Sequence, residues 1–435
     1  MAGRVQLATS GNQDTFFTDN PEFTHFIKRF RKHTNFAMYD IRHEFNGEIG
    51  YGNKLKCTIP SDSGDLIKSI RLHINLPSLE RDGTYYKYIE SIGHAIIEYV
   101  DLTIGGQLIQ RIPRDWLQIY SEQYVSQSKQ VNLSKLIGKN PNEISGDSVS
   151  ESIDNYLDNA VKPRTYIIDI PFYFHNNPAL YIPLQALKTQ ECEIEVQLSP
   201  GKFCVYNYLN AIDEGFDETT MKINSVYLHT EMVLLDRIER NFVNSLQRDY
   251  IITQVQRNVF GIPQSLEEGA TVNKFRLNFS NPIKELYFVI SRVSNEDKLY
   301  SYFDYDHPSQ IYPVNGKYIN YENLVSLEMT LDKEIILDNV TGNLINLRAV
   351  QSGIHHSRTQ LFRRFYSYSF ALQPEKWYPT GQVNFSNIKD QLISLNLNNN
   401  TSDIRELRVY AINYNILRIK NGTGQLLFPN GPVGY

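Results

Sequence analysis

Apolar and polar residues alternate without a break in the segment Ile70-Arg71-Leu72-His73-Ile74-Asn75-Leu76, and this pattern indicates the fold. Successive side chains of a β-strand point to opposite faces of the sheet, so this alternation predicts a strand with one buried face. The pattern returns at residues 100–104, 192–198, 275–279 and 393–397. Because each sheet must cover its apolar face with another layer, we expect an all-β protein built from antiparallel sandwiches.

The length of the chain sets the number of sandwiches. A single hydrophobic core stops growing at roughly 250–300 residues, so 435 residues predict two domains. Residues 236–246 have the pattern of a short helix that Asp236 can cap, and we take this helix as the connector. The predicted organisation is an N-terminal arm (1–24), a first domain (25–234), a helical linker (235–247) and a second domain (248–435).

Other segments interrupt the strands. Residues 113–127 predict a helix, because Pro113 can open one and apolar residues follow at helical spacing. The Asn46-Gly47 and Gly105-Gly106 pairs tolerate positive φ and are hairpin candidates. Two polar segments, 128–162 and 291–323, are expected to be long loops.

Composition excludes several classes of function. The 43 basic and 48 acidic residues give a net charge of −5, which argues against a dedicated nucleic-acid surface. The three cysteines, Cys57, Cys192 and Cys204, are too few for a disulfide framework and too scattered for a zinc site. Their number fits a reducing compartment, and residues 1–11 lack the apolar core of a signal peptide, so we expect synthesis in the cytoplasm.

The sequence carries no motif for catalysis or for binding a cofactor. It has no Gly-rich phosphate loop, no nucleophile elbow and no paired Cys spacing, so we expect no enzyme and assign no catalytic, cofactor or metal residues. The cluster of Asp304, Asp306 and His307 could hold a metal but is interpreted as a polar loop tip. The His355-His356 pair, beside Gly353, is interpreted as part of a solvated turn.

Two weaker signals concern modification and docking. Asn-x-Ser/Thr sequons occur at seven positions; Asn278 and Asn384 are expected on strands, which leaves five glycosylation candidates: Asn132, Asn339, Asn399, Asn400 and Asn421. A basic run follows the arm and could form a docking surface through Lys28, Arg29, Arg31 and Lys32.

A set of short motifs stands near the N-terminus: Gly11-Asn12-Gln13-Asp14, Asn20-Pro21 and the run at residues 30–37. Further motifs follow in order: 50–54, 64–67, 102–107, 115–116, 171–174, 178–187, 276–279, 281–282, 368–372, 374–375, 379–381, 384–386 and 413–419, with Gly422 and Gly424. Through these motifs the chain resembles the major capsid proteins of the large eukaryotic DNA viruses, the group of the chlorella viruses, iridoviruses and their giant relatives. The chain departs from the family at 128–162 and 261–350.

The resemblance implies a double jelly roll, with two consecutive eight-stranded antiparallel sandwiches and short helices in loops. It also implies a homotrimer that forms a pseudo-hexagonal capsomer and tiles an icosahedral virion with neighbouring capsomers. By the same resemblance the arm and the basic run would lie on the inner side, towards minor capsid proteins and an internal viral membrane. No specific nucleic acid is implied as a partner.

Three other interpretations stay open from the sequence. A minor or penton-associated capsid paralogue would share the fold and differ in copy number. The aromatic content (29 Tyr, 22 Phe) also suits a carbohydrate-binding β-sandwich, which would need exposed aromatic rings or a carboxylate pair about 5–10 Å apart. The two long loops could in addition bind a host receptor.

Overall fold

The alternating stretch at residues 70–76 lies in strand β3 (Leu66–Leu76), where Ile70, Leu72 and Ile74 are fully buried. In this computed structural model β3 pairs with β11 (Ser225–Leu235), and Leu72 lies opposite Leu228. The structure describes residues 2–9, 11–28, 30–79, 86–89, 91–139, 163–175, 177–207, 221–245, 247–262, 272–292, 323–358, 365–397 and 405–431. It divides into two units, 1–36 and 37–435.

The first unit contains two short helices, α1 (Ala2–Ala8) and α2 (Asn12–Thr18). Its side chains are exposed wherever the structure describes them, and they include five phenylalanines in the stretch before the first strand. That strand, β1, begins at Phe36, later than the sequence indicated. The described residues before Phe36 form no strand.

The first half of the second unit contains two four-stranded antiparallel paths. One runs β1-β11-β3-β7, with the short strand β8 beside β3, and the other runs β2-β9-β5-β6. The eight strands of these two paths, numbered from 1 to 8 in the order of the sequence, give the strand orders 1-8-3-6 and 2-7-4-5. This is the topology of a jelly roll. Their bounds are β1 Phe36–Glu44, β2 Lys54–Ile59, β5 Ile97–Ile104, β6 Gln107–Pro113, β7 Arg164–Asp169, β8 Ile182–Pro183 and β9 Cys192–Leu198, with a small separate pair, β4 Tyr86–Tyr88 and β10 Val205–Asn207.

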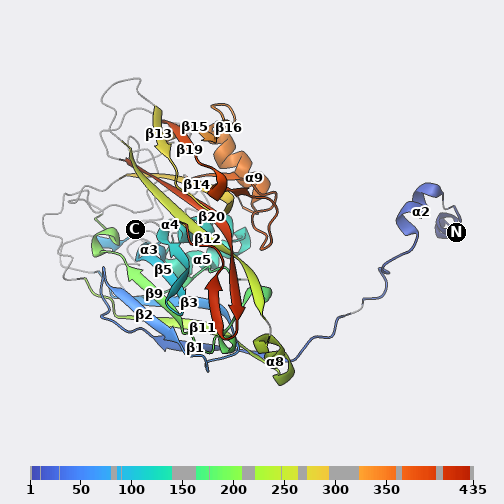
Figure 1. The fold of residues 1–435 in the computed structure, drawn as a ribbon, viewed down its shortest axis with the longest axis horizontal. Coiled ribbons are helices and arrows are strands. Elements are labelled where there is room, and N and C mark those ends of the chain that lie inside the picture. Colours follow the sequence, from blue (N-terminus) through green and yellow to red (C-terminus); the bar gives the residue numbers. More distant parts are fainter. Residues whose placement is uncertain are drawn as a thin grey trace. The chain divides into compact units, whose positions relative to one another are not determined.

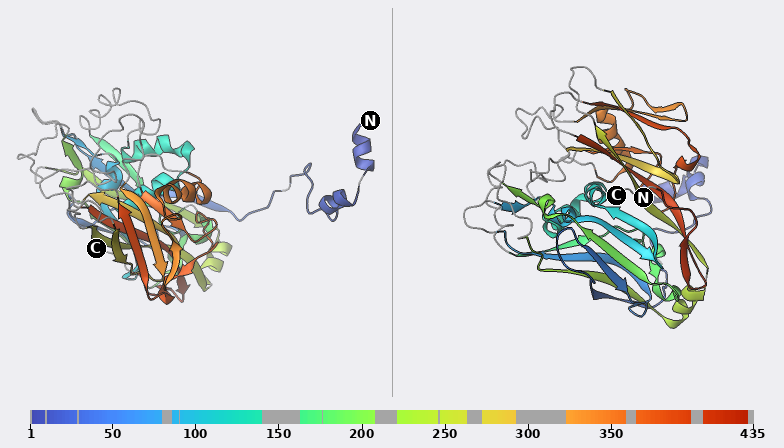
Figure 2. Two further views of the ribbon diagram at one scale, coloured as in Figure 1. Left: turned by 90° about the horizontal axis from the view of Figure 1, so that it is seen from above. Right: turned by 60° about the vertical axis from the view of Figure 1, so that its left-hand side comes forward.

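The second half repeats the same strand order. Its sheets run β12-β20-β14-β17 and β13-β19-β15-β16, again 1-8-3-6 and 2-7-4-5. The chain is therefore a double jelly roll, as expected (Figures 1 and 2). The bounds are β12 Arg248–Ile262, β13 Val272–Arg276, β14 Pro282–Arg292, β15 Leu324–Leu331, β16 Glu334–Leu337, β17 Phe365–Ser369, β18 Val383–Asn384, β19 Gln391–Leu397, β20 Arg405–Lys420 and β21 Thr423–Leu426.

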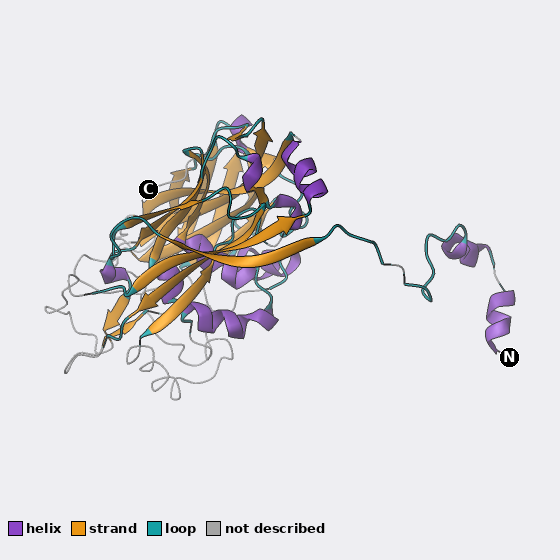
Figure 3. Cartoon of the chain, turned by 90° about the horizontal axis from the view of Figure 1, so that it is seen from below, coloured by secondary structure: helices purple, strands orange, loops and turns teal. Residues whose placement is uncertain are grey.

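Helices lie in the connections between strands (Figure 3). The predicted helix after Pro113 is α4 (Arg114–Gln123), and the predicted connector is α8 (Arg237–Ser245). Among the residues that the structure describes after β1, the other helices are α3 Ile92–Ala95, α5 Gln130–Ile137, the π-helix η7 Asn346–Val350, α9 Gln351–His355 and the 3₁₀ turns η1 Gln127–Lys129, η2 Pro178–Leu180, η3 Leu184–Ala186, η4 Gly201–Phe203 and η8 Phe385–Asn387.

Two local predictions have different outcomes. Gly105 and Gly106 both have positive φ and join β5 to β6 as a two-residue hairpin, which confirms that turn. The loop predicted from residue 128 is wrong at its start, because α5 forms there. The inward side chains of α5 are Gln130, Ser134 and Ile137, and two of these are polar, so the helix shows no apolar periodicity.

The two jelly rolls share a continuous apolar layer. Strand β14 is buried on both faces: Leu286 and Phe288 face the core of the second jelly roll, whereas Tyr287 and Val289 belong to the core cluster of the first. Strand β20 is buried in the same way. The β12-β20-β14-β17 sheet is therefore covered on its outer face by the first jelly roll.

Candidate functional site

The contact between the jelly rolls is the most elaborate polar site among the described residues. Helix α4 of the first jelly roll lies against the outer face of the β12-β20-β14-β17 sheet. Trp116 meets Tyr287 edge-to-face with ring centroids 5.5 Å apart. Next to it, the Asp115 carboxylate accepts hydrogen bonds from the Tyr410 hydroxyl at 2.5 Å and from the Arg408 guanidinium at 3.2 Å. Asp115 and Arg408 are buried, so a satisfied ion pair crosses the interface.

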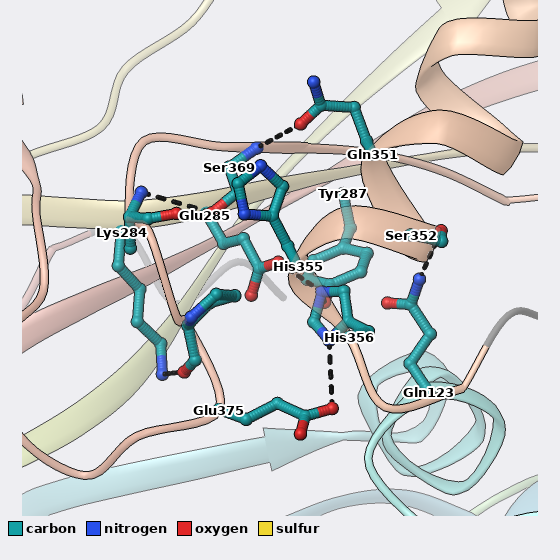
Figure 4. A network of polar contacts seen from close by, with 12 residues as sticks. Gln123, Lys284, Glu285, Tyr287, Gln351, Ser352, His355, His356, Ser369 and Glu375 are labelled. Atoms are coloured by element: carbon teal, nitrogen blue, oxygen red, sulfur yellow. Dashed lines mark hydrogen bonds and ion pairs between the residues drawn. The ribbon is translucent and has the colours of Figure 1, made fainter. Parts of the chain in front are cut away.

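A second buried pair lies close to α4 (Figure 4). Nε2 of His356 is 2.5 Å from Oε1 of Glu285, and both side chains are 1% exposed. The Tyr124 hydroxyl, at the end of α4, donates to the other Glu285 oxygen at 2.7 Å. On its far side, Nδ1 of His356 lies 3.5 Å from Glu375. Strand β14 supplies Glu285 and the end of α9 places His356 over it.

The charges of this network are mutually stabilising. Burial alone would lower the pKa of His356, but the Glu285 and Glu375 carboxylates outweigh it and raise that pKa to about 9. Burial raises the pKa of Tyr124 and Tyr287 well above the ordinary value, and the Glu285 charge raises it further. His356 is thus an imidazolium at neutral pH, and the tyrosines remain hydrogen-bond donors.

The next residues of α4 extend the contact. Glu122, 1% exposed, forms ion pairs with Lys139 and, at 3.4 Å, with Arg358, which comes from the second jelly roll. Gln123 donates to the Ser352 hydroxyl at 2.7 Å. Helix α4 therefore has polar side chains over much of its surface and is still buried, because residues of the second jelly roll form hydrogen bonds and ion pairs with these side chains.

The C-terminal residues bind back to the first jelly roll. Asn430 donates to the carbonyl of Leu108 at 2.7 Å, and the backbone N–H of Gly424 donates to Gln190 at 2.6 Å. Gln254 of β12 donates to the carbonyl of Ile109 at 2.5 Å. These bonds add a second attachment between the jelly rolls.

The structure corrects the interpretation of the histidine pair. His355 is half-buried, but His356 is buried in an ion pair and does not lie in a solvated turn. The neighbouring Gly353 suggested a turn, whereas α9 continues to His355 and directs His356 inward. Its partner Glu285 is 71 residues away, so no local pattern could reveal the pair.

The sequon residues are scattered over the surface. Asn132 is exposed on α5, Asn339 is exposed beside a turn, and Asn421 is exposed in the turn between β20 and β21. Asn384 lies on β18 as expected, but Asn278 lies beyond the end of β13. Asn399 and Asn400 lie outside the described residues.

Of the basic run, Lys28, Arg31 and Lys32 are exposed in the first unit, and Arg29 lies outside the described residues, as do Asp304, Asp306 and His307. Among the residues that are described, no cluster of three His, Cys, Asp or Glu side chains could hold a metal ion. In the same part of the chain, no helix is long and apolar enough to cross a membrane.

Two jelly rolls in tandem, joined through a buried interface, define the class of double jelly-roll capsid proteins. The sequence profile described as "Major capsid protein N-terminus" matches residues 24–238, and the profile described as "Large eukaryotic DNA virus major capsid protein" matches residues 239–425. The chain belongs to this family of large eukaryotic DNA virus major capsid proteins, and its role is structural.

Two individual relatives match this chain over almost its whole length. The chain is 28% identical to the major capsid protein of Phaeocystis pouchetii virus, with 98% of this chain and 99% of the relative covered. It is 27% identical to the major capsid protein of Paramecium bursaria Chlorella virus 1, covering 99% and 100%. A solved structure of the PBCV-1 virus capsid superimposes with a TM-score of 0.75 at 22% identity, covering 94% of this chain and all of that one, which supports the fold.

Proposed function

We propose that the chain is the major capsid protein of a large double-stranded DNA virus and that three copies form a pseudo-hexagonal capsomer. The observation that carries this proposal is the repeated strand order: one chain supplies two blocks of the same topology. Three such chains in a closed ring present six similar blocks, which suits a hexagonal lattice on an icosahedral shell. The subunit acts in the virion shell after synthesis in the host cytoplasm, and it is not an enzyme.

The native mass of the purified chain tests the trimer. A subunit of 50.4 kDa predicts 3 × 50.4 ≈ 151 kDa by light scattering. A well-folded protein of 50.4 kDa that does not associate would contradict the proposal. Copy number in purified virions then separates a major capsid protein from a minor or penton-associated paralogue of the same fold.

We propose the domain boundaries that the sequence suggested: an arm at 1–24, jelly rolls at 25–234 and 248–435, and a linker at 235–247. The two family matches meet at 238/239, inside α8 (Arg237–Ser245), which supports a boundary there. Limited proteolysis should cut first in the arm. Because the jelly rolls share a buried interface, cleavage near α8 should leave the two halves associated.

We propose that the basic run after the arm, with Lys28, Arg29, Arg31 and Lys32, binds minor capsid proteins on the inner face of the shell, near the internal viral membrane. Exposed aromatic side chains accompany these charges, with Phe26 95% and Phe30 85% exposed. Cross-linking mass spectrometry of virions should connect these lysines to another viral protein. Cross-links that reach only the outer loops of neighbouring capsomers would contradict this placement.

We propose Asn339 and Asn421 as the best glycan acceptors among the five candidates, since both are exposed beside or within turns. Asn132 suits a glycan less, because its sequon lies in a helix and the Ser134 side chain is buried. The mass of virion-derived protein compared with 50.4 kDa, before and after glycosidase, tests the proposal.

A further inference from the structure

Three histidines lie on three adjacent strands of the first jelly roll. His43 belongs to β1, His229 to β11 and His73 to β3, and these strands are neighbours in the β1-β11-β3-β7 sheet (Figure 1). We call these residues the histidine cluster. His73 and His229 lie on the outer face of the sheet, with ring centroids 4.3 Å apart. His43 points inward, where its Nε2 lies 2.8 Å from the hydroxyl of Thr230.

The surroundings of His73 disfavour a positive charge on its ring. The side chain is 8% exposed, and its buried Nε2 has no hydrogen-bond partner within the described part of the chain. Tyr227 stacks on the ring with centroids 4.9 Å apart, and the Arg42 guanidinium lies 4.0 Å from the Tyr227 centroid. Arg71 is the preceding residue of β3 on the same face, and the uncharged Ile167 lies opposite His73 on β7. A protonated His73 would therefore lie near two guanidinium groups.

The carboxylates near the cluster already bind other cations. Asp40 of β1 lies 2.9 Å from Arg71, and Asp169 of β7 lies 3.9 Å from it. Glu231 of β11 lies 3.4 Å from the same guanidinium and also forms an ion pair with Lys68. These pairs compensate the charge of Arg71 and Lys68, so they offer little compensation to a further imidazolium.

The cluster therefore couples folding to pH. Burial is the largest cause that lowers the pKa of His73 to about 4, and the positive charge of His229 is the next. The two nearby arginines lower this pKa further, whereas Asp40 acts in the opposite direction. Burial and the charge of His229 also lower the pKa of His43. Because folding lowers the pKa of His73, its contribution to stability is complete above pH 6.5 and is lost as the pH falls towards 4.

Strand β1 is the element that protonation can displace most easily. It is the edge strand of its sheet and pairs only with β11 in the strand order. Its first residues are largely exposed, with Phe36 48% and Met38 54% exposed, so little apolar burial holds them. The contacts that Asp40, Arg42 and His43 make, given above, attach β1 to the cluster and to its immediate neighbours. Opening between β1 and β11 would admit water to the histidine rings.

We propose that the histidine cluster is an acid-sensitive switch that releases edge strand β1 from the first jelly roll. Two imidazolium rings 4.3 Å apart, beside two guanidinium groups, repel one another, and separation of the strands relieves this repulsion. The chain runs directly from residues 1–36 into β1, so release of the strand also frees the attachment of that segment. The switch goes beyond the proposed capsid role, because it adds a response to acidification, and it does not depend on the number of copies in the oligomer.

Hydrogen–deuterium exchange of the full chain at pH 7 and pH 5, corrected for the intrinsic exchange rate, tests the switch. If opening returns the pKa of His73 from about 4 to 6.5, the protection factor of the β1 amides should fall about 20-fold between these pH values. Strand β20, which is buried on both faces, serves as the internal reference and should keep its protection. Equal protection of β1 at both pH values, or the same fall in β20, would overturn the inference.

Two variants assign the fall to the cluster. His73→Phe keeps an aromatic ring beside Tyr227 and removes the titrating group, so the fall should shrink to less than about 5-fold. His229→Gln removes the neighbouring positive charge at a partly exposed position, and it should also make the fall smaller. The control His25→Gln, exposed in the first unit, should behave as the wild type. A wild-type fall that both cluster variants retain in full would overturn the assignment to these histidines.

Discussion

Replacing Glu285 by Gln should destabilise the protein in a way that depends on pH. The carboxylate holds His356 as an imidazolium in a site where both side chains are 1% exposed. The pKa of His356, raised from 6.5 to about 9, corresponds to about 3 kcal/mol of stability. Removing one partner of a buried pair costs roughly 3–5 kcal/mol, which agrees with this value.

The direction of the pKa shift determines whether the stability contribution of His356 is lost as the pH rises or as it falls. Because folding raises the pKa of His356, its contribution is complete below pH 6.5 and is lost as the pH rises through about 9. Glu285→Gln should therefore lower the free energy of unfolding by about 3 kcal/mol near pH 6.5. Above pH 9 the variant and the wild type should converge.

Urea denaturation at fixed protein concentration, followed by tryptophan fluorescence, measures the effect. Trp116 contacts Tyr287 beside the network and reports on this interface. The control Asp249→Asn removes a carboxylate from a pair with Arg418 that remains in contact with water, and it should change the midpoint little. If Glu285→Gln loses the same stability at pH 6.5 and at pH 9.5, the loss does not come from the charge on His356.

Three further predictions concern the interior. Asp115→Ala should lower the free energy of unfolding by roughly 3–5 kcal/mol, because it breaks the buried pair that crosses between the jelly rolls, whereas Asp390→Ala, in an exposed pair, should have little effect in the same denaturation assay. Gly138→Ala should destabilise more than Gly106→Ala: φ is +77° and +79°, but only at position 138 would a Cβ approach a neighbouring ring atom, at 2.7 Å, and melting temperatures compare the two. Burial raises the pKa of the Cys192 thiol to about 12, so alkylation at pH 8 should require unfolding; rapid labelling of the native protein would contradict this.

The sequence predicts those strands that have one buried face and one solvent-exposed face. In β9 buried residues alternate with partly exposed polar ones, and in β3 apolar residues alternate with polar ones from Ile70 to Leu76, so the sequence reveals both strands and their orientation. Helix α4 could also be predicted, from Pro113 and the spacing of Trp116 and Leu117. The sequence does not show that this helix is buried, because the partners of Asp115 lie in β20, almost 300 residues later.

Strands that are buried on both faces show a weaker alternation of apolar and polar residues in the sequence. In β14, Glu285 is buried although charged, because the outer face of its sheet lies under the first jelly roll, where Tyr124 donates to it. In the sequence, a polar residue on this face of β14 has the pattern of a solvent-exposed position. The buried position of His356 was missed for the same reason: long-range ion pairs leave no local pattern. The repeated strand order, likewise, is a property of pairing and not of residue identity.

Cryo-electron microscopy of the purified oligomer would show whether three copies form the proposed capsomer. We expect a ring with threefold symmetry and six lobes, because each chain supplies two jelly rolls of the same topology. Isolated two-lobed particles, or a twofold dimer, would contradict this arrangement.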